Sequence, residues 1–308
     1  MEEQASYNEK KRTTMHILNP RAGKGTASQI RKRLKDSDEC VHLSQTPEDT
    51  VAFIKNACEK EPNTCFTIYG GDGTVFRAVN SIMESGHNDT ASLKIVPIGS
   101  GNDFVKSLKD LPSEICSDVM RVNGRYAINI VNMGFDCSVV VRTAKLKKHP
   151  LITGKMAYIM GVIGELAKKK PMQAKITITY SDGSEEVLED KFLLIAVGNG
   201  QYYGGGFKAT PGAKLDDGLL DVTIVKDVTR RTFIGIVGAY KKGKHIIDAQ
   251  NCIVKPNCQS FVFYKRCVKI KIEGIERVCC DGEIFNEDSV EISVIPKAIN
   301  LVLEKKKK

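Results

Sequence analysis

The segment Gly70–Thr74, with the sequence GGDGT, combines residue types that suit a nucleotide-binding loop. It follows the short apolar run Phe66–Tyr69 and precedes Val75–Met83, which has the pattern of a helix. Glycines let a phosphate chain approach the backbone closely, and N–H groups of the loop and the helix start can donate to phosphate oxygens. The Asp72 carboxylate would repel a phosphate but suits a magnesium ion beside one. A glycine-rich turn with an aspartate cap is the alternative from this segment alone.

A second loop of this kind, Asn19–Gly25 with the sequence NPRAGKG, follows the β-prone run Thr14–Asn19. Its Lys24 is a candidate cation for a phosphate group. The loop is not a Walker A motif, because neither GxxxxGKS nor GxxxxGKT occurs in the chain. On its own this loop is a weak signal.

The third loop, within Pro97–Phe104 and the sequence PIGSGNDF, follows the strand-like run Lys94–Ile98. Ser100 can donate a hydrogen bond to a phosphate, and the oxygens of Asn102 and Asp103 suit a metal ion. Three phosphate-compatible loops after three successive strands are far more specific than any one of them.

Two acidic segments stand out in the second half of the chain. Asp216–Asp221, with the sequence DDGLLD, clusters hard oxygen ligands for Mg²⁺ or Ca²⁺, and a solvated turn is the alternative. Asp281–Glu283, with the sequence DGE, lies between two apolar runs and is a candidate for a base with a raised pKa. An ordinary Asp-Gly hairpin with an exposed glutamate is the alternative there.

About the first 130 residues alternate apolar runs with amphipathic stretches, which predicts strands alternating with helices. The predicted strands are Thr14–Asn19, Val41–Ser44, Phe66–Tyr69 and Lys94–Ile98, and the predicted helices are Ala27–Lys35, the stretch from Pro47 to Lys60 with Thr46 as its cap, and Val75–Met83. This order indicates a parallel sheet with helices on its faces. Ligands of such sheets bind at the carboxyl ends of the strands, where all three glycine-rich loops fall.

The pattern changes after about residue 130, where β-rich runs separated by Gly, Asp and Pro predominate. These runs are Arg125–Val131, Ala174–Tyr180, Val187–Ala196, Leu219–Val225, Ser260–Tyr264, Cys267–Glu273 and Val290–Val294, and the helical stretches are Tyr158–Lys168 and Thr232–Lys241. We therefore expect two domains, an α/β domain over residues 1–130 and a mostly antiparallel β-sandwich or flattened barrel over residues 131–308.

The 308-residue chain has the composition of a folded protein, with 42% apolar and 27% charged residues. Its formal net charge of +9 is unevenly placed, because residues 1–144 are neutral overall and residues 145–308 carry the whole excess. The lysines cluster at Lys145, Lys147 and Lys148, at Lys168–Lys170, at Lys241, Lys242 and Lys244, and at Lys305–Lys308. A basic half favours an anionic partner such as a membrane surface, a nucleic acid or a phosphorylated ligand, and a solvated lysine-rich surface is the alternative.

Other features narrow the class of protein. The chain has no Trp, and Tyr and Phe rarely flank the lysine clusters, which argues against nucleic acid as the partner. No apolar stretch reaches the roughly 18 residues of a membrane span, and the start of the chain lacks a secretion signal. The ten cysteines form no CxxC pair and no zinc-site spacing with histidine, so we expect reduced thiols in a cytosol.

Six motifs now stand in one order along the chain. They are NPRAG at Asn19–Gly23, GGDGT at Gly70–Thr74, PIGSGNDF at Pro97–Phe104, GFD at Gly134–Asp136, DGLLD at Asp217–Asp221 and DGE at Asp281–Glu283. Together they resemble the soluble bacterial diacylglycerol kinase and sphingosine kinase-like lipid kinase family, over about residues 14–303. The resemblance implies an N-terminal nucleotide-binding domain like those of NAD kinase and phosphofructokinase and a C-terminal β-sandwich domain. It also implies an active site in the cleft between them, and a last strand that returns toward the first domain.

The resemblance assigns roles by motif. The implied ATP-binding residues are Asn19, Pro20, Arg21, Ala22, Gly23, Lys24, Thr46, Gly71, Asp72, Gly73, Thr74, Ser100, Asn102 and Asp103. The implied catalytic residues are the general base Glu283, with Asp281 beside it, and Asp72, which with Asp103 would organise magnesium and the phosphates. A structural magnesium would be held by the Lys214 carbonyl, the Asp217 side chain and the Leu219 carbonyl, linked through water to the Asp72 network. After GGDGT the family usually has Leu-Asn-Glu, so the resemblance leaves a nucleotide contact from Phe76 and Arg77 open.

The activity that this resemblance implies is transfer of the γ-phosphoryl group of ATP, with Mg²⁺, to the hydroxyl of a membrane lipid. Diacylglycerol, giving phosphatidic acid, is the first expectation, and a sphingoid base or phosphatidylglycerol is an alternative acceptor. NAD kinase and a non-enzymatic basic protein that binds membrane or nucleic acid are the remaining alternatives. We expect a cytoplasmic protein that lies on the inner face of an anionic membrane and does not bind nucleic acid. The sequence does not decide between a monomer and a homodimer.

Overall fold

The computed structural model describes residues 12–35, 40–146, 154–168 and 170–303. Its α/β half is built on parallel strands in the order β2-β1-β3-β4. They are β1 (Thr14–Leu18), β2 (Cys40–Leu43), β3 (Cys65–Gly70) and β4 (Ser92–Pro97). Because all four run the same way, their carboxyl ends meet at one edge, as the sequence predicts.

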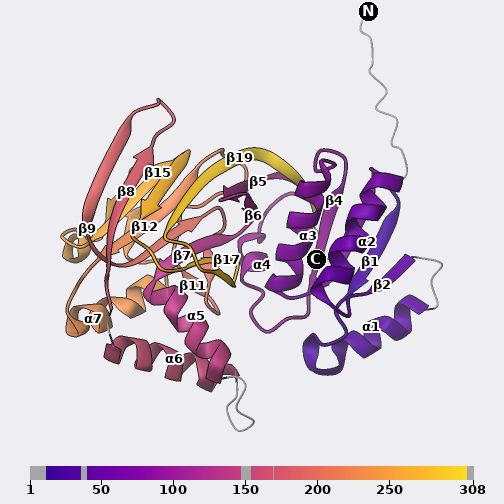
Figure 1. Ribbon diagram of the computed structural model, residues 1–308, viewed down its shortest axis with the longest axis horizontal. Helices are drawn as coiled ribbons and strands as arrows, with labels where there is room; N and C mark the ends of the chain where they lie inside the picture. The colour runs from indigo at the N-terminus through magenta and orange to yellow at the C-terminus, as the bar shows by residue number, and fades with distance from the viewer. Residues whose placement is uncertain (1–11, 36–39, 147–153, 169, 304–308) are drawn as a thin grey trace, which may run out of the picture.

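Helices follow these strands and cover the sheet (Figure 1). They are α1 (Thr26–Lys35), α2 (Pro47–Lys60), α3 (Asp72–Ser85) and the short α4 (Asp103–Ser107), with a 3-10 turn at Gly23–Gly25. The predicted cap at Thr46 is confirmed, since its hydroxyl accepts from the Asp49 N–H and Asp49 accepts from the Thr46 N–H. Helix α3 ends at Gly86, whose φ of 73° stops the helix in the left-handed region.

The β-rich half is mostly antiparallel, which confirms the predicted class. Its main strands are β5 (Glu114–Val122), β6 (Arg125–Ala127), β7 (Ile130–Gly134), β8 (Met172–Thr179), β9 (Glu185–Gly198), β12 (Leu220–Lys226), β15 (Val262–Cys267), β16 (Lys269–Glu273), β17 (Val278–Cys280), β18 (Glu283–Phe285) and β19 (Ser289–Val302). Two small hairpins are β10 (Tyr202–Tyr203) with β11 (Phe207–Lys208) and β13 (Ile246–Asp248) with β14 (Ile253–Val254). The helices are α5 (Phe135–Leu146), α6 (Gly154–Lys168) and α7 (Arg230–Lys241), with a 3-10 turn at Pro256–Cys258.

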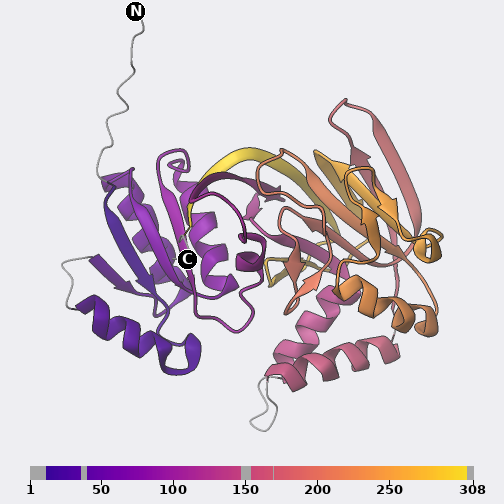
Figure 2. The same ribbon diagram turned by 180° about the vertical axis from the view of Figure 1, so that it is seen from behind.

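Strand β19 joins the two halves. Its first part pairs antiparallel with β16, whereas its end pairs parallel with β4, as in the register Leu301 to Leu93. Figures 1 and 2 show this strand in yellow, crossing from the β-rich half into the α/β half. Ile299 and Leu301 of β19 are buried in the same apolar cluster as the α/β strands. The two halves therefore share one continuous sheet and part of one core.

One predicted strand is wrong. The run Arg125–Val131 is two strands, because β6 pairs with β5 while β7 pairs with β9 and β17. Between them the backbone N–H groups of Ile128 and Asn129 donate to the Asp281 carboxylate rather than to a neighbouring strand. Helix α5 is a second difference, since the sequence analysis expects no helix after the GFD motif.

Candidate active site

The three glycine-rich loops hold one another at the carboxyl edge of the parallel sheet. The Asn19 N–H donates to the Tyr69 carbonyl at 3.0 Å, and the Asn19 amide donates to the Thr74 hydroxyl at 3.3 Å. The Ile98 N–H donates to the Gly70 carbonyl at 3.1 Å, which ties the third loop to the GGDGT loop.

Two glycines allow these loops to approach closely. A Cβ on Gly99 would stand 2.5 Å from the Gly71 Cα, and a Cβ on Gly101 would stand 2.7 Å from Asp72 Oδ2. A side chain at Gly99 would press on the backbone of the GGDGT loop, and a side chain at Gly101 would displace the Asp72 carboxylate, so glycine permits both approaches.

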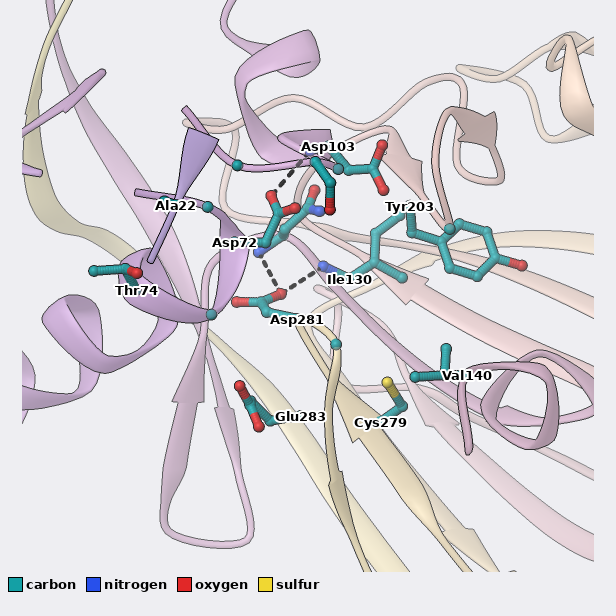
Figure 3. Close-up of a pocket in the computed structure, with 18 of the residues that line it drawn as sticks. Ala22, Asp72, Thr74, Asp103, Ile130, Val140, Tyr203, Cys279, Asp281 and Glu283 are labelled. Carbon is teal, nitrogen blue, oxygen red and sulfur yellow. Dashed lines mark hydrogen bonds between the residues drawn. The ribbon is translucent and has the colours of Figure 1, made fainter. Parts of the chain in front are cut away.

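The loops form one wall of a cavity of about 590 Å³ between the two halves (Figure 3). Of the predicted site residues, the cavity is lined by Asn19, Arg21, Ala22, Gly23, Gly71, Asp72, Gly73, Thr74, Ser100, Asp103, Asp281 and Glu283. The structure thus brings together residues from the N-terminal loops and from the DGE segment, which lie about 200 positions apart.

Asp72 and Asp103 lie side by side in this cavity. Asp72 Oδ1 accepts from the Asp103 N–H at 2.9 Å, so it caps the start of α4. Asp103 Oδ1 pairs with Lys106, and Oδ2 accepts from the Gly205 N–H of the β-rich half at 2.7 Å. Burial raises the pKa of Asp72, and the neighbouring Asp103 charge adds to the rise. Both Asp103 oxygens therefore have protein partners, and Asp72 is the carboxylate of the two that could face a divalent cation arriving with ATP.

Asp281 is buried and binds the segment of chain that connects the two halves. Its carboxylate accepts from the N–H groups of Ile128, Asn129 and Ile130 at 2.8, 3.0 and 2.9 Å. Burial raises the pKa of Asp281 to about 7, although the three N–H groups lower it. Asp281 and Gly282 have φ values of 48° and 95°, and they form the two-residue turn between β17 and β18. This turn places Glu283 at the cavity.

Glu283 lies directly over the GGDGT loop. A Cβ on Gly73 would stand 2.9 Å from Glu283 Oε1, so a side chain there would displace the carboxylate from its present position. Arg77 lies one helical turn after Gly73 and places its guanidinium 3.6 Å from the same oxygen. The Glu283 side chain is 41% exposed, so the carboxylate faces the open cavity while Arg77 supports it from α3.

Four predicted ATP-binding residues are not placed in the cavity wall. Pro20 and Thr46 do not line it, and the Thr46 hydroxyl serves as the cap of α2. Asn102 does not line it either, since its amide turns back to the Gly99 carbonyl at 2.9 Å. The side chain of Lys24 lies outside the described part of the chain. Contacts from these four residues to ATP stay predictions.

Comparisons with known proteins agree with this geometry. Residues 13–132 match the diacylglycerol kinase catalytic domain, and residues 129–303 match the YegS C-terminal NAD kinase beta sandwich-like domain. The chain is 28% identical over 277 residues to a protein of Alcanivorax borkumensis named "Probable lipid kinase YegS-like", covering 85% of this chain and 86% of that one. A protein of the same name from Chromohalobacter salexigens is 30% identical over 248 residues, or 75% of this chain and 73% of that one.

The chain belongs to the YegS-like lipid kinase family. A solved structure described as a diacylglycerol kinase from Bacillus anthracis str. Sterne has the same fold, with a TM-score of 0.66 and 22% identity over 95% of this chain and 97% of that chain. Membership of the family favours a lipid kinase over NAD kinase and over a non-enzymatic protein.

The DGLLD turn of this kinase is arranged differently from the cavity. Asp217 Oδ2 pairs with the Arg266 guanidinium, and Oδ1 accepts from the Leu219 N–H at 3.2 Å. Arg266 also lies 3.6 Å from Asp221, whose carboxylate accepts from the Tyr264 hydroxyl. Burial raises the pKa of Asp221 to about 6, and Arg266 opposes the rise.

This donor set does not fit the implied structural magnesium. Both Asp217 oxygens already have partners, and one partner is a cation that would repel Mg²⁺. Within the described residues no group of three His, Cys, Asp or Glu side chains is placed to hold a metal. We therefore derive no step through a metal at Lys214, Asp217 and Leu219, and metal binding there stays a prediction that requires Arg266 to release Asp217.

Arg77, whose contact with nucleotide the sequence analysis leaves open, lines the cavity beside Glu283. Several other cavity residues are missed by the sequence analysis. From the β-rich half the cavity also receives Asn129, Ile130, Asn132, Val140, Tyr203 and Cys279. Tyr203 donates to Asp136 of the GFD motif and lies 3.1 Å from the Tyr240 hydroxyl. These residues come from separate strands and from α5, so no local spacing marks them.

Proposed function

We propose that this lipid kinase transfers the γ-phosphoryl group of ATP to the hydroxyl of 1,2-diacylglycerol and forms phosphatidic acid. The observation that carries the proposal is the position of Glu283, a carboxylate of the β-rich half, over Gly73 of the phosphate loop. A base that takes a proton from a lipid hydroxyl must stand where the phosphate chain ends, and the closeness of Glu283 to Gly73 supports that role for it.

The proposed reaction uses residues from both walls of the cavity. The loop N–H groups and the start of α3 hold the ATP phosphates, and Asp72 faces the magnesium that enters with ATP as part of the substrate. Glu283 accepts the hydroxyl proton while the hydroxyl oxygen forms a bond to the γ-phosphorus. The bond from that phosphorus to the β–γ bridging oxygen breaks, and ADP leaves with it. Arg77 supplies positive charge beside the transferred group.

The charge of the cavity supports diacylglycerol over the other acceptors. Among the described residues, no lysine or arginine of the β-rich half lines this cavity, so on that side no cation faces the phosphate of phosphatidylglycerol. On the described side of the β-rich half, the amine of a sphingoid base meets no open carboxylate besides Glu283 itself, because Asp281 is held by three N–H groups. Ile130, Val140 and Cys279 offer an apolar side for a neutral glycerol ester.

The proposal includes a site of action at the membrane. The described residues contain no helix that is both long and apolar enough to cross a bilayer. The excess of +9 over residues 145–308 supports peripheral binding to an anionic leaflet on the cytoplasmic side.

A mixed-micelle assay with labelled ATP tests the proposal. Diacylglycerol, sphingosine and phosphatidylglycerol are supplied in separate reactions, with NAD as a further acceptor. We expect diacylglycerol to have a kcat/KM at least about tenfold above any other acceptor and to give a product that co-migrates with phosphatidic acid. A higher kcat/KM for sphingosine, phosphatidylglycerol or NAD would overturn the assignment of the acceptor. Loss of the signal in Glu283→Gln but not in Glu291→Gln, a surface glutamate paired with Lys269, excludes a contaminating kinase.

A further inference from the structure

Exposed apolar side chains are concentrated in one region of the molecule. Seven large hydrophobic residues are exposed in the part of the chain that the structure describes, and six of them lie on α6, α7 and the β13–β14 hairpin. The six are Met156, Met160, Ile163, Ile234, Ile247 and Ile253, and the seventh is Val187 on β9. The described α/β half exposes none, so this concentration is not a general property of the surface.

Packing explains why one face of α6 is left outside. Ala157 is fully buried, and a Cβ on Gly161 would stand 2.7 Å from the Thr143 hydroxyl of α5, so small residues form the face that packs on α5. Met160 and Ile163 lie on another face of the helix and are 42% and 62% exposed. The only acidic residue of α6, Glu165, is paired with Arg142 of α5 and is 18% exposed.

Helix α7 continues this surface. Ile234 is 59% exposed, and the exposed glycines beside it, Gly235 and Gly238, have open space where a Cβ would stand. The Arg230 guanidinium donates to the carbonyls of Leu166 and Ala167 at 3.0 and 2.7 Å, which fixes the start of α7 to the end of α6. Figures 1 and 2 show both helices on the same side of the β-rich half.

The charges near these apolar side chains are mostly positive. Residues 230–255 hold six basic residues and a single acidic one, Asp248, and α7 itself has no acidic residue. Arg231, Lys242, Lys244 and Lys255 are all exposed. Exposed apolar side chains near an excess of cations match the interface of an anionic bilayer, in which acyl chains lie below negative headgroups.

We propose that this α6–α7 surface, consisting of Met160, Ile163, Ile234, Ile247 and Ile253 with Arg231, Lys242 and Lys244, docks the protein on an anionic lipid bilayer by inserting the apolar side chains. The inference rests on the proposed function only in that the acceptor is a membrane lipid. Helix α6 packs on α5, and Val140 of α5 lines the cavity, so the docked surface lies one helix layer from the acceptor side (Figure 3). Insertion there brings the bilayer to the mouth through which a lipid headgroup would enter.

Vesicle co-sedimentation tests the surface without using activity. The apolar variant carries Met160→Gln, Ile163→Gln and Ile234→Gln, and the basic variant carries Lys242→Gln and Lys244→Gln. The matched controls are Val187→Gln, an exposed apolar residue elsewhere, and Lys55→Gln on α2. The vesicles are phosphatidylcholine with and without phosphatidylglycerol, at low and high salt, and melting curves establish that each variant is folded.

We expect the apolar variant to lose at least about tenfold in vesicle affinity at both salt concentrations, and the basic variant to lose it only at low salt and only on anionic vesicles. The controls should bind as the wild type does. Equal binding by the apolar variant and Val187→Gln would overturn the proposal, and so would a change in oligomeric state by light scattering, because the face would then belong to a second copy. Vesicle binding without phosphorylation of diacylglycerol would refute the proposed function and leave this surface standing.

Discussion

Two acidic regions of this kinase use similar residues in opposite ways. At the GGDGT loop, Asp72 and Glu283 face a cavity of about 590 Å³. At the DGLLD turn, Asp217 and Asp221 are held by Arg266 and Tyr264, and Asp118 accepts from the Gly218 and Lys297 N–H groups, each at 2.7 Å. Both regions join segments far apart in sequence. Carboxylates that face open space can take part in chemistry, whereas carboxylates that pair with groups of the protein hold segments of the fold together.

The largest effect is expected from Asp72→Asn. The variant keeps an oxygen for the Asp103 N–H but loses the charge that we propose faces magnesium, so kcat/KM for ATP should fall by about 10²–10³-fold. Its melting temperature at neutral pH should stay the same or rise. The folded-state pKa of Asp72 is raised, so its ionisation lowers stability as pH rises above the ordinary value of 3.8, and Asn avoids that loss.

Steady-state kinetics and thermal melting measure the two quantities, with Asp89→Asn on the exposed surface as the control. A variant that melts several degrees lower and keeps its kcat/KM would show that Asp72 stabilises the fold and does not act in catalysis. The two acidic regions would then not differ in role.

Asp118→Ala should show the reverse behaviour. Asp118 is 0% exposed, and its removal leaves the N–H groups of Gly218 and Lys297 without their acceptor. At about 1–3 kcal/mol for each of the two orphaned groups, the free energy of unfolding should fall by roughly 2–6 kcal/mol. Urea unfolding measures the loss, and kcat well below the melting temperature should be retained. Asp216→Ala, an exposed carboxylate of the same turn, is the matched control, and an equal loss there would contradict the role of Asp118.

Arg77→Met tests whether the positive charge of Arg77 contributes to phosphoryl transfer. The guanidinium lies in the cavity 3.6 Å from Glu283, so its removal takes positive charge from beside the transferred phosphoryl group. We expect kcat/KM for ATP to fall by about tenfold or more, with Arg77→Lys recovering part of it because a cation remains. Identical kinetics for the Met and Lys variants would show that the charge is not what matters.

The smallest effect concerns magnesium at the DGLLD turn. Arg266→Met frees Asp217, so Mg²⁺ without nucleotide should raise the melting temperature of the variant and leave the wild type unchanged. At a concentration tenfold above its Kd the ion would contribute about 1.4 kcal/mol. A magnesium response of the wild type would show that the metal displaces Arg266 from Asp217.

The same variant has a predicted dependence on pH. Burial raises the pKa of Asp221 to about 6, so folding takes up a proton and stability falls as pH rises from 3.8 through about 6. Without Arg266 the buried charge is less compensated, and the deficit of the variant relative to the wild type should be larger at pH 8 than at pH 5. Melting curves across this pH range measure the deficit in stability. A deficit that does not change with pH would show that ionisation of Asp221 is not its cause.

Local signals explain what the sequence could predict. The strand–loop–helix order of the first half and the cap at Thr46 depend on residues within a few positions of one another, and the structure confirms them. The three loops are predicted together because parallel strands bring their ends to one edge. The residue types of DGE also suggest a hairpin with a carboxylate, and the structure has that hairpin.

Contacts between distant segments explain the rest. The break between β6 and β7 depends on Asp281, about 150 positions later, and neither segment alone indicates it. Arg266 reaches Asp217 across 49 positions and changes a turn that looks suited to a metal into one with its own cation. The place of Tyr203 in the cavity depends on a tertiary contact with Asp136, 67 positions away.

A rapid-quench comparison of the wild type with Glu283→Gln tests the central claim most directly. With saturating MgATP and dispersed short-chain diacylglycerol, a single turnover isolates the chemical step from membrane binding and product release. The glutamine keeps the size of the side chain but cannot accept the hydroxyl proton. We predict a chemical step slower by about 10²–10⁴-fold, with the ATP affinity changed less than about twofold and the melting temperature unchanged. A single-turnover rate equal to that of the wild type would contradict the assignment of Glu283 as the base.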